Sequence, residues 1–380
     1  MKRPFFFTAA ILFLGASVAP AQPAAPAAPA TPSATPAPAA APAPGRAARP
    51  PAPARDPLSP GFVKFTELPD GEVPPMEANG NFIIGPTHKP APEMSPVADG
   101  QPKGTVHKFV LDSAESKFYP GVERDPTSSP DNTSITTRPK PYKRTVSVYV
   151  PAQYKPGTEA PVLITSDGDG RAFNVLDRLI PEKKLPVMIV VAIPPGGPDG
   201  RGGQRNLEYD TMSGKYSDFV ETEVLPMAEK VANVKLTKDP NGRAVMGTSS
   251  GAAAGMIMAW FHPERYSRVL TFSGTFTNNQ WPTNPEFPHG AWGLHETLIP
   301  NSPVKKLRIY TMVGDRDNLS GPMRDWVQAN NHMARVLAEK GYPYKFVFAR
   351  NAGHTDRPTI AQLYPTALQW IWQGYPIDGK

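Results

Sequence analysis

One serine of this chain stands in a sequence context that favours nucleophilic chemistry. Ser249 is the centre of the pentapeptide Gly247–Gly251, which follows the apolar run Arg243–Met246 and opens the alanine-rich run Ala252–Trp260. A strand, a tight turn and a helix form the context in which G-x-S-x-G presents a serine hydroxyl at the end of a sheet. The turn needs its two glycines because a Cβ there would clash with the crowded backbone. We therefore predict that Ser249 is a nucleophile.

A serine hydroxyl needs a base to remove its proton and a carboxylate to orient that base. Both residue types follow Ser249 in the order Ser, acid, His. Asp317 lies three residues past Gly314, after an apolar run, and His354 lies in a glycine-containing loop after the last apolar run. Of the seven histidines, His354 alone has this placement. Asp315 is the rival acid; its closeness to the strand suits it instead to bonding loop amides.

The tetrahedral intermediate of such a reaction needs two backbone N–H donors. We expect one from Ser250, directly after the nucleophile. The second should come from the loop Ser166–Gly170, at Asp169 or Gly168, where glycines let the backbone approach closely. The alternative is that this loop is a plain turn without a role in the reaction. Its two acids are too few to form a calcium site.

Eight β-like runs follow residue 100, and segments with helical periodicity separate them. In the run Thr145–Val150, apolar and polar residues alternate, which is typical of a half-exposed strand near a sheet edge. The later runs are continuously apolar, as in parallel strands covered on both faces. The eight runs are Val106–Leu111, Thr145–Val150, Val162–Thr165, Val187–Ile193, Arg243–Met246, Arg268–Phe272, Leu307–Val313 and Tyr344–Ala349. The helical segments are Tyr216–Val231, Met323–Lys340 and Ile360–Trp372. This alternation predicts a three-layer α/β fold with a mostly parallel eight-stranded sheet, in which Ser249 follows the fifth strand.

The first residues have the features of a secretory signal peptide, residues 1–21. Lys2 and Arg3 precede the apolar stretch Phe5–Val18, which is too short to span a membrane, and Ala19–Ala21 fits the small-x-small cleavage rule. We expect cleavage there, export to the periplasm or beyond, and no stable membrane insertion of the mature chain.

Composition divides the rest of the chain into three segments. Residues 22–60 are almost all Ala and Pro and should form an extended linker without chemistry. Residues 61–103 are rich in Pro, Gly and Asn. We interpret them as a loop-rich segment that packs against the domain and call it the lead-in. Residues 104–380 are long enough for one large domain with its own core.

Charge and cysteine content exclude several classes of site. The chain has no cysteine, which excludes disulfides, thiolate nucleophiles and Cys-ligated metals. The formal charge is +6, of which Lys2 and Arg3 supply two, and no run of Lys and Arg indicates nucleic-acid binding. No pattern in the sequence specifies an oligomeric state.

From about Gly104 to Trp372 the chain resembles enterochelin (ferric siderophore) esterases and, more broadly, feruloyl and acetyl-xylan esterases and mycolyl transferases. The segments that carry this resemblance are Val148–Tyr154, Asp167-Gly168, Arg205–Asp210, Glu223–Pro226, Gly247–Gly251, Ala259-Trp260, Phe272–Phe276 and Gly353-His354. The resemblance implies an α/β-hydrolase fold, with Ser249 as nucleophile, Asp317 as acid and His354 as base. It implies no metal and no organic cofactor. Many relatives have Gly-Gly where this chain has Gly251-Ala252; a methyl group there should be tolerated on the helix.

Two further features lie near the expected active-site face. Arg205 and Glu208 match a family motif, and a structural ion pair is favoured over substrate binding by Arg205. The loop Thr277–Pro300 carries Trp281, Trp292 and two histidines. It either lines a cleft for an aromatic substrate or simply packs on the domain.

These features together predict an exported serine esterase that acts through an acyl-enzyme. Its substrate would be a small-molecule or polysaccharide-linked ester: a siderophore trilactone, or a feruloyl or acetyl ester of plant polysaccharide. An acyltransferase of the same fold is one alternative, and a non-catalytic binding module is another. Fold alone does not select the substrate.

Overall fold

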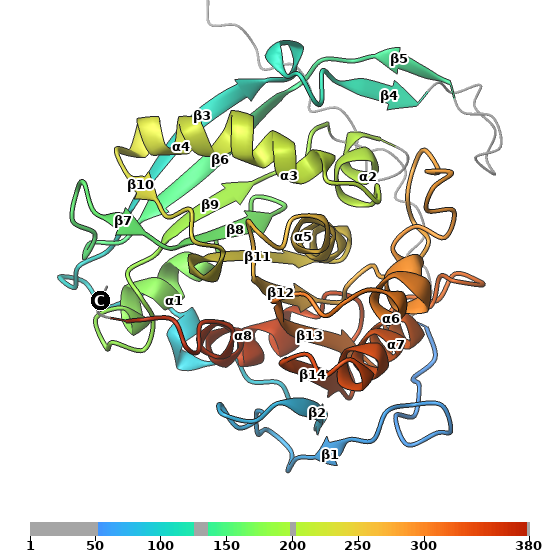
Figure 1. The fold of residues 1–380 in the computed structure, drawn as a ribbon. Coiled ribbons are helices and arrows are strands. Elements are labelled where there is room, and N and C mark those ends of the chain that lie inside the picture. Colours follow the sequence, from blue (N-terminus) through green and yellow to red (C-terminus); the bar gives the residue numbers. More distant parts are fainter. Residues whose placement is uncertain (1–51, 125–135, 198–202, 378–380) are drawn as a thin grey trace, which may run out of the picture. The chain divides into compact units, whose positions relative to one another are not determined.

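The fold is organised around one ten-stranded sheet (Figure 1), with the order β1-β2-β14-β13-β12-β11-β8-β9-β6-β3. The computed structural model describes residues 52–124, 136–197 and 203–377. The expected signal peptide and residues 22–51 of the expected linker lie outside them. The strands are β1 Thr66–Glu67, β2 Gly80–Ile84, β3 Thr105–Asp112, β6 Lys143–Val150, β8 Val162–Ser166, β9 Ile189–Ile193, β11 Arg243–Thr248, β12 Arg268–Phe272, β13 Arg308–Gly314 and β14 Tyr344–Ala349.

All eight predicted strands are present, and the sheet gains two more from the lead-in. In β2, Phe82 and Ile83 pair in parallel with Val347 and Phe348 of β14, and both side chains are buried. Without β2, the apolar strand β14 would present an unpaired edge, which is a site of unwanted strand pairing. The sheet therefore has ten strands where the sequence predicts eight.

Nine of the ten strands share one direction. The exception is β6, which runs antiparallel to both β9 and β3, so that β3 again has the direction of the others. Strand β3 forms the outer edge, where Val106 and Val110 are exposed. The order reverses around β8, because the chain moves outward to β9 and then returns to β11 on the other side. The carboxyl ends of strands at such a reversal are where open α/β sheets bind ligands.

Helices cover both faces of the sheet and create two apolar cores (Figure 1). One core lies under α3, α4, α5 and α7, and the other under α1 and α8. The α-helices are α1 Ala172–Leu179, α2 Gln204–Tyr209, α3 Lys215–Phe219, α4 Leu225–Ala232, α5 Ser250–Phe261, α6 Ile299–Asn301, α7 Trp326–Glu339 and α8 Arg357–Ile371. The smaller elements are 3-10 turns at Pro92–Met94, Ser113–Glu115 and Pro240–Gly242, and the strand pairs β4 Val122–Arg124 with β5 Thr137–Pro139 and β7 Glu159–Ala160 with β10 Lys235–Leu236.

The predicted helix Tyr216–Val231 is interrupted in its middle. A π-helical turn, Val220–Val224, separates α3 from α4. Pro226 lies just after it, and proline lacks the N–H and clashes with the carbonyl four residues earlier, so the ladder widens by one residue. A second π-helical turn, Leu294–Leu298, precedes Pro300 in the same way.

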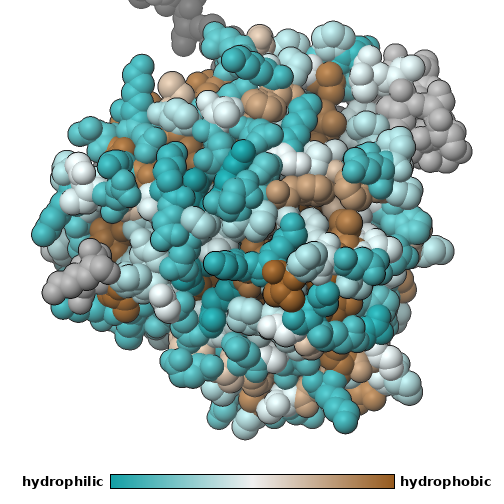
Figure 2. Space-filling model, in the orientation of Figure 1, coloured by the Kyte–Doolittle hydropathy of each residue, from teal (hydrophilic) through white to brown (hydrophobic). Residues whose placement is uncertain are grey.

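The surface seen in Figure 2 carries mostly hydrophilic side chains, because the apolar ones are enclosed between the sheet and its helices. None of the helices within the described ranges combines the length and the apolar character needed to span a bilayer.

Candidate active site

Ser249 occupies a sharp turn between β11 and α5. Its backbone has φ 55° and ψ −128°, a conformation that a non-glycine residue adopts only at a cost. The flanking glycines permit the turn: a Cβ on Gly247 would lie 2.2 Å from the backbone of Gly251, and one on Gly251 would lie 2.7 Å from the Cβ of Ser166. The turn therefore lifts the Ser249 side chain out of the ladder at the carboxyl edge of the sheet.

Ser249, His354 and Asp317 form a hydrogen-bonded line. The Nε2 atom of His354 lies 2.9 Å from the Oγ atom of Ser249, and its Nδ1 atom lies 2.6 Å from Oδ1 of Asp317. Asp317 is fully buried, whereas His354 is partly exposed. This arrangement places Nδ1–H toward the carboxylate and leaves the Nε2 lone pair for the serine proton.

The structure gives Asp315 and Asp317 different partners. The two carboxylate oxygens of Asp315 accept the backbone N–H groups of Asn351 and Ala352, at 3.0 and 3.1 Å. Asp315 thus holds the loop that carries His354, as expected for the rival acid, while Asp317 contacts the imidazole itself.

Two further residues at the site were not predicted from the sequence. The Oγ1 atom of Thr275 lies 3.3 Å from Oγ of Ser249 and accepts the indole N–H of Trp326 at 3.0 Å. The Trp326 ring packs edge-on against His354, with ring centroids 5.8 Å apart. Thr275 follows β12 inside a segment that carries the family resemblance, which is the only sequence signal we find for it; Trp326 gives none.

The two loop amides expected to bind an oxyanion already have acceptors. The N–H of Gly168 donates to the Ile193 carbonyl and that of Asp169 donates to the Ser166 carbonyl, both at 3.1 Å. Ser250 lies at the first position of α5, where a helix leaves its N–H groups without intrahelical acceptors. The geometry therefore favours the amide of Ser250 over those of the loop in this conformation.

Arg205 and Glu208 each form an ion pair, but not with one another. Arg205 donates from Nε and one terminal nitrogen to the two carboxylate oxygens of Asp167, at 2.8 and 3.0 Å. Glu208 is buried and pairs with Arg144, at 2.5 and 2.9 Å. Arg205 thus braces the loop after β8, and its fork is occupied by protein rather than free for a substrate.

The aromatic loop Thr277–Pro300 packs on the domain. Trp281 is only 2% exposed, and Trp292 is partly buried against the imidazoles of His295 and His332. Burial lowers the pKa of His295 to about 3, so this imidazole is neutral. These contacts favour packing on the domain over the lining of a substrate cleft. Burial of large aromatic rings contributes strongly to the energy of a protein core.

Asp210 is a buried carboxyl group next to the turn at Ser249. It accepts the side-chain amides of Asn206 and Asn279, at 2.7 and 3.1 Å. Burial raises its pKa to about 7, while Arg205 and hydrogen bonds from Ser250 and both amides act in the opposite direction. One of these hydrogen bonds thus joins Asp210 to Ser250, the residue that follows Ser249.

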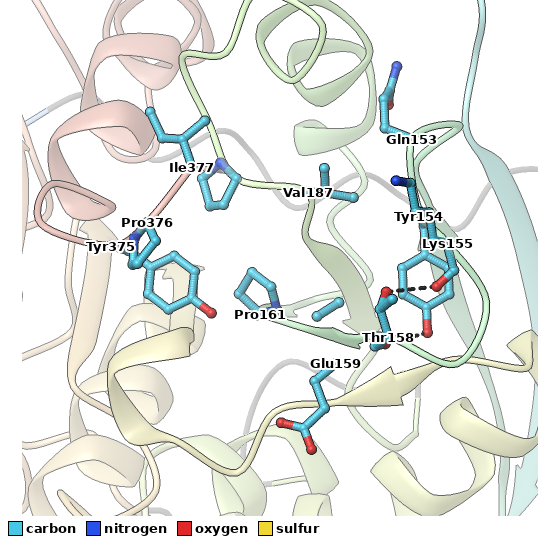
Figure 3. A pocket seen from close by; sticks show the side chains of 12 residues that line it. Gln153, Tyr154, Lys155, Thr158, Glu159, Pro161, Val187, Tyr375, Pro376 and Ile377 are labelled. Carbon is cyan, nitrogen blue, oxygen red and sulfur yellow. Dashed lines mark hydrogen bonds between the residues drawn. The ribbon is translucent and has the colours of Figure 1, made fainter. Parts of the chain in front are cut away.

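Within the ranges that the structure describes, no three His, Asp or Glu side chains are arranged to bind a metal ion. A pocket of about 430 Å³ is lined by Tyr154, Pro161, Val187 and Tyr375 (Figure 3). Pro161 immediately precedes β8, so this pocket lies at the amino end of that strand, whereas the loop beside Ser249 follows its carboxyl end.

Comparison with known proteins gives one family and several relatives. The family model described as "Putative esterase" matches residues 140–368. Two Bacillus subtilis proteins, both called uncharacterized, are similar: YjcH is 22% identical over 211 residues (53% of this chain and 81% of that protein) and YbbA is 22% identical over 247 residues (60% and 92%).

Two solved structures share the fold. The enterobactin esterase of Shigella flexneri has a TM-score of 0.50 at 19% identity, over 73% of this chain and 64% of that one. A ferulic acid esterase of the anaerobic fungus Anaeromyces mucronatus has a TM-score of 0.50 at 14% identity, over 74% of this chain and 96% of that one. The match thus spans less than two thirds of the Shigella protein. At these identities the likeness establishes the fold, and the predicted α/β-hydrolase fold is confirmed.

Proposed function

The chain belongs to the esterase family whose model covers residues 140–368, and from this premise we propose that it is a serine carboxylic-ester hydrolase. The observation that carries the proposal is the hydrogen-bonded line from Ser249 through His354 to buried Asp317. A hydroxyl, an imidazole and a carboxylate in this order are the parts that acyl transfer through a covalent intermediate requires.

In the proposed reaction the Oγ atom of Ser249 attacks the ester carbonyl while Nε2 of His354 takes the hydroxyl proton. Asp317 holds the imidazole by its Nδ1–H and stabilises the imidazolium that forms. The imidazolium then gives its proton to the departing alcohol, which leaves an acyl group on Ser249. A water molecule, deprotonated by the same nitrogen, attacks the acyl carbonyl; the bond to Oγ of Ser249 then breaks, the imidazolium returns the proton to Oγ, and the acid is released.

The negative oxygen of each tetrahedral intermediate would bind the N–H of Ser250. The second donor in this proposal is the N–H of Asp169, whose hydrogen would be shared between the Ser166 carbonyl and the oxyanion. A hydrogen shared between two acceptors in this way is well known in proteins and is common at helix termini.

The acyl group and the place of action extend this proposal. We infer export after removal of residues 1–21, and action on a siderophore ester or lactone. A feruloyl or acetyl ester of a polysaccharide is the alternative, because the two solved structures with the same fold are called an enterobactin esterase and a ferulic acid esterase. Turnover of a panel of ferric siderophore, feruloyl and acetyl-xylan esters separates them. Product analysis with an added alcohol separates hydrolysis from acyl transfer.

The hydrolase proposal is tested with p-nitrophenyl acetate and a fluorophosphonate. We expect turnover by the wild type, covalent labelling located on Ser249 by peptide mass spectrometry, and loss of both in Ser249→Ala. Ser302→Ala, which removes a hydroxyl at the end of α6, is the matched control and should keep both. Absence of turnover together with absence of labelling in the folded wild type would leave a non-catalytic binding module as the better description.

A further inference from the structure

We propose that Arg55 is a positioning residue for the carboxylate of Asp317, and that the N-terminal segment 52–60 is thereby part of the catalytic apparatus. This inference rests on the proposed function, since it assigns Asp317 the role of the triad acid. Arg55 lies within the stretch that the composition alone assigns to a linker without chemistry.

Arg55 contacts the loop that carries Asp315 and Asp317, which we call the acid loop, with both its backbone and its side chain. Its backbone N–H donates to the carbonyl of Asp315 at 2.9 Å, and its guanidinium donates to the carbonyl of Asp317 at 2.5 Å. The side chain is 13% exposed, so these bonds are largely shielded from water. Two bonds from one residue to positions two apart fix the backbone from which the Asp317 side chain extends.

The same guanidinium reaches the helix that supports His354. It lies 3.4 Å from Oδ1 of Asp325, and that oxygen caps α7 by accepting the N–H groups of Val327 and Gln328. The residue directly after Asp325 is Trp326, whose ring packs against His354. Arg55 therefore joins the acid loop to the start of α7, the two elements that flank the imidazole.

The charge of Arg55 suits this place. Asp317 and Asp325 both carry carboxylates, and the planar fork of a guanidinium can serve a carbonyl and a carboxylate together, which a lysine ammonium does with less directional control. The end of the expected linker is held by this contact, and the first residues after it are held by Asn331, which binds the backbone of Gly61 and Val63. The chain that leads into the domain is thus tied to the acid loop 262 residues later in the sequence.

A positioning role predicts a change in the chemical step rather than in substrate binding. In Arg55→Ala we expect kcat for p-nitrophenyl acetate, and the rate of fluorophosphonate labelling, to fall about 10-fold, because small displacements of catalytic groups have large effects on rate. KM should change less than twofold. Millimolar ethylguanidinium should restore a part of the rate, and Arg55→Lys should retain more of it than Arg55→Ala.

The matched control is Asn81→Ala. The Asn81 side chain binds the Lys64 carbonyl and the Tyr344 hydroxyl, so it ties the chain just after the N-terminal segment to the domain, and neither bond involves the acid loop. Thermal unfolding of both variants shows how much of any loss is due to stability, and we expect Asn81→Ala to keep its kcat and to be unaffected by ethylguanidinium.

Two results overturn the role of Arg55: an unchanged kcat in Arg55→Ala, or a loss that ethylguanidinium does not restore and that Asn81→Ala reproduces. If the wild type hydrolyses no ester and takes no label, the proposed function fails first. If the wild type is active and Arg55→Ala is as fast, only the role of Arg55 fails.

Discussion

Asp315 and Asp317 are separated by one residue on the same loop and hold two different parts of the segment that carries His354. Asp317 binds the imidazole at 2.6 Å, and Asp315 binds the backbone N–H groups at Asn351 and Ala352. The strand that ends at Gly314 is thus followed by one carboxylate that binds the His354 side chain and another that binds the backbone of its loop.

This division predicts opposite effects of two similar substitutions. Asp317→Asn should lower kcat by about 10³- to 10⁴-fold with little change in stability, because the amide favours the wrong imidazole tautomer. Asp315→Asn should cost about 1–3 kcal/mol of unfolding free energy by losing the charge assistance of its bonds to the amides of Asn351 and Ala352, the second of which is buried, with a smaller loss of kcat. Steady-state kinetics and urea unfolding of both variants measure this; equal losses of kcat would contradict it.

The turn at Ser249 should tolerate no side chain at its two glycines. We expect Gly247→Ala to be destabilised by about 1–3 kcal/mol or to fail to fold, because its Cβ would lie 2.2 Å from the backbone of Gly251. Gly255→Ala on α5 is the matched control: its Cβ would meet Val245 at 3.4 Å, and it should gain up to about 1 kcal/mol of helix propensity. Urea unfolding compares them, and a tolerated Gly247→Ala would show that the turn can relax.

The pair of Glu208 and Arg144 should matter for stability far more than a surface pair. Both side chains are almost fully buried, so Glu208→Gln leaves an uncompensated guanidinium and should cost about 3–5 kcal/mol. Glu159 pairs with Lys235 at 2.8 Å, but both are exposed, and Glu159→Gln should leave the urea midpoint unchanged. Similar midpoints for the two variants would show that water reaches the inner pair.

Asp210 should make stability depend on pH between about 4 and 7. Burial raises its pKa to about 7 in the folded protein, against an ordinary value of 3.8, so the folded state binds more protons in this range. Its contribution is therefore most favourable below pH 4 and is lost as the pH rises to 7. Relative to wild type, Asp210→Asn should gain on the order of 4 kcal/mol between pH 4 and pH 8, at about 1.4 kcal/mol per pKa unit. Urea unfolding across this range checks it; parallel curves would mean that Asp210 stays ionised.

The sequence predicted the central sheet well and its edge poorly. Continuous apolar runs locate β8 and β11 because a parallel strand must bury both faces, and this requirement acts within the strand itself. β2 gave only a short apolar piece in a loop-rich segment, and its status as a strand depends on pairing with β14, which lies more than 250 residues later. The interruption at Val220–Val224 follows from Pro226, which the sequence contains but the helical pattern hides.

By itself, the sequence determined the features that local rules specify: the turn at Ser249, the alternation of strands and helices, and the order of serine, acid and histidine. These depend on periodicity and on backbone crowding within a few residues. Only the tertiary structure decided which acid meets His354, that Arg205 and Glu208 have separate partners, that Trp281 is buried, and that Arg55 reaches Asp317. Those outcomes depend on distances between segments far apart in the chain, which packing fixes and local pattern does not encode.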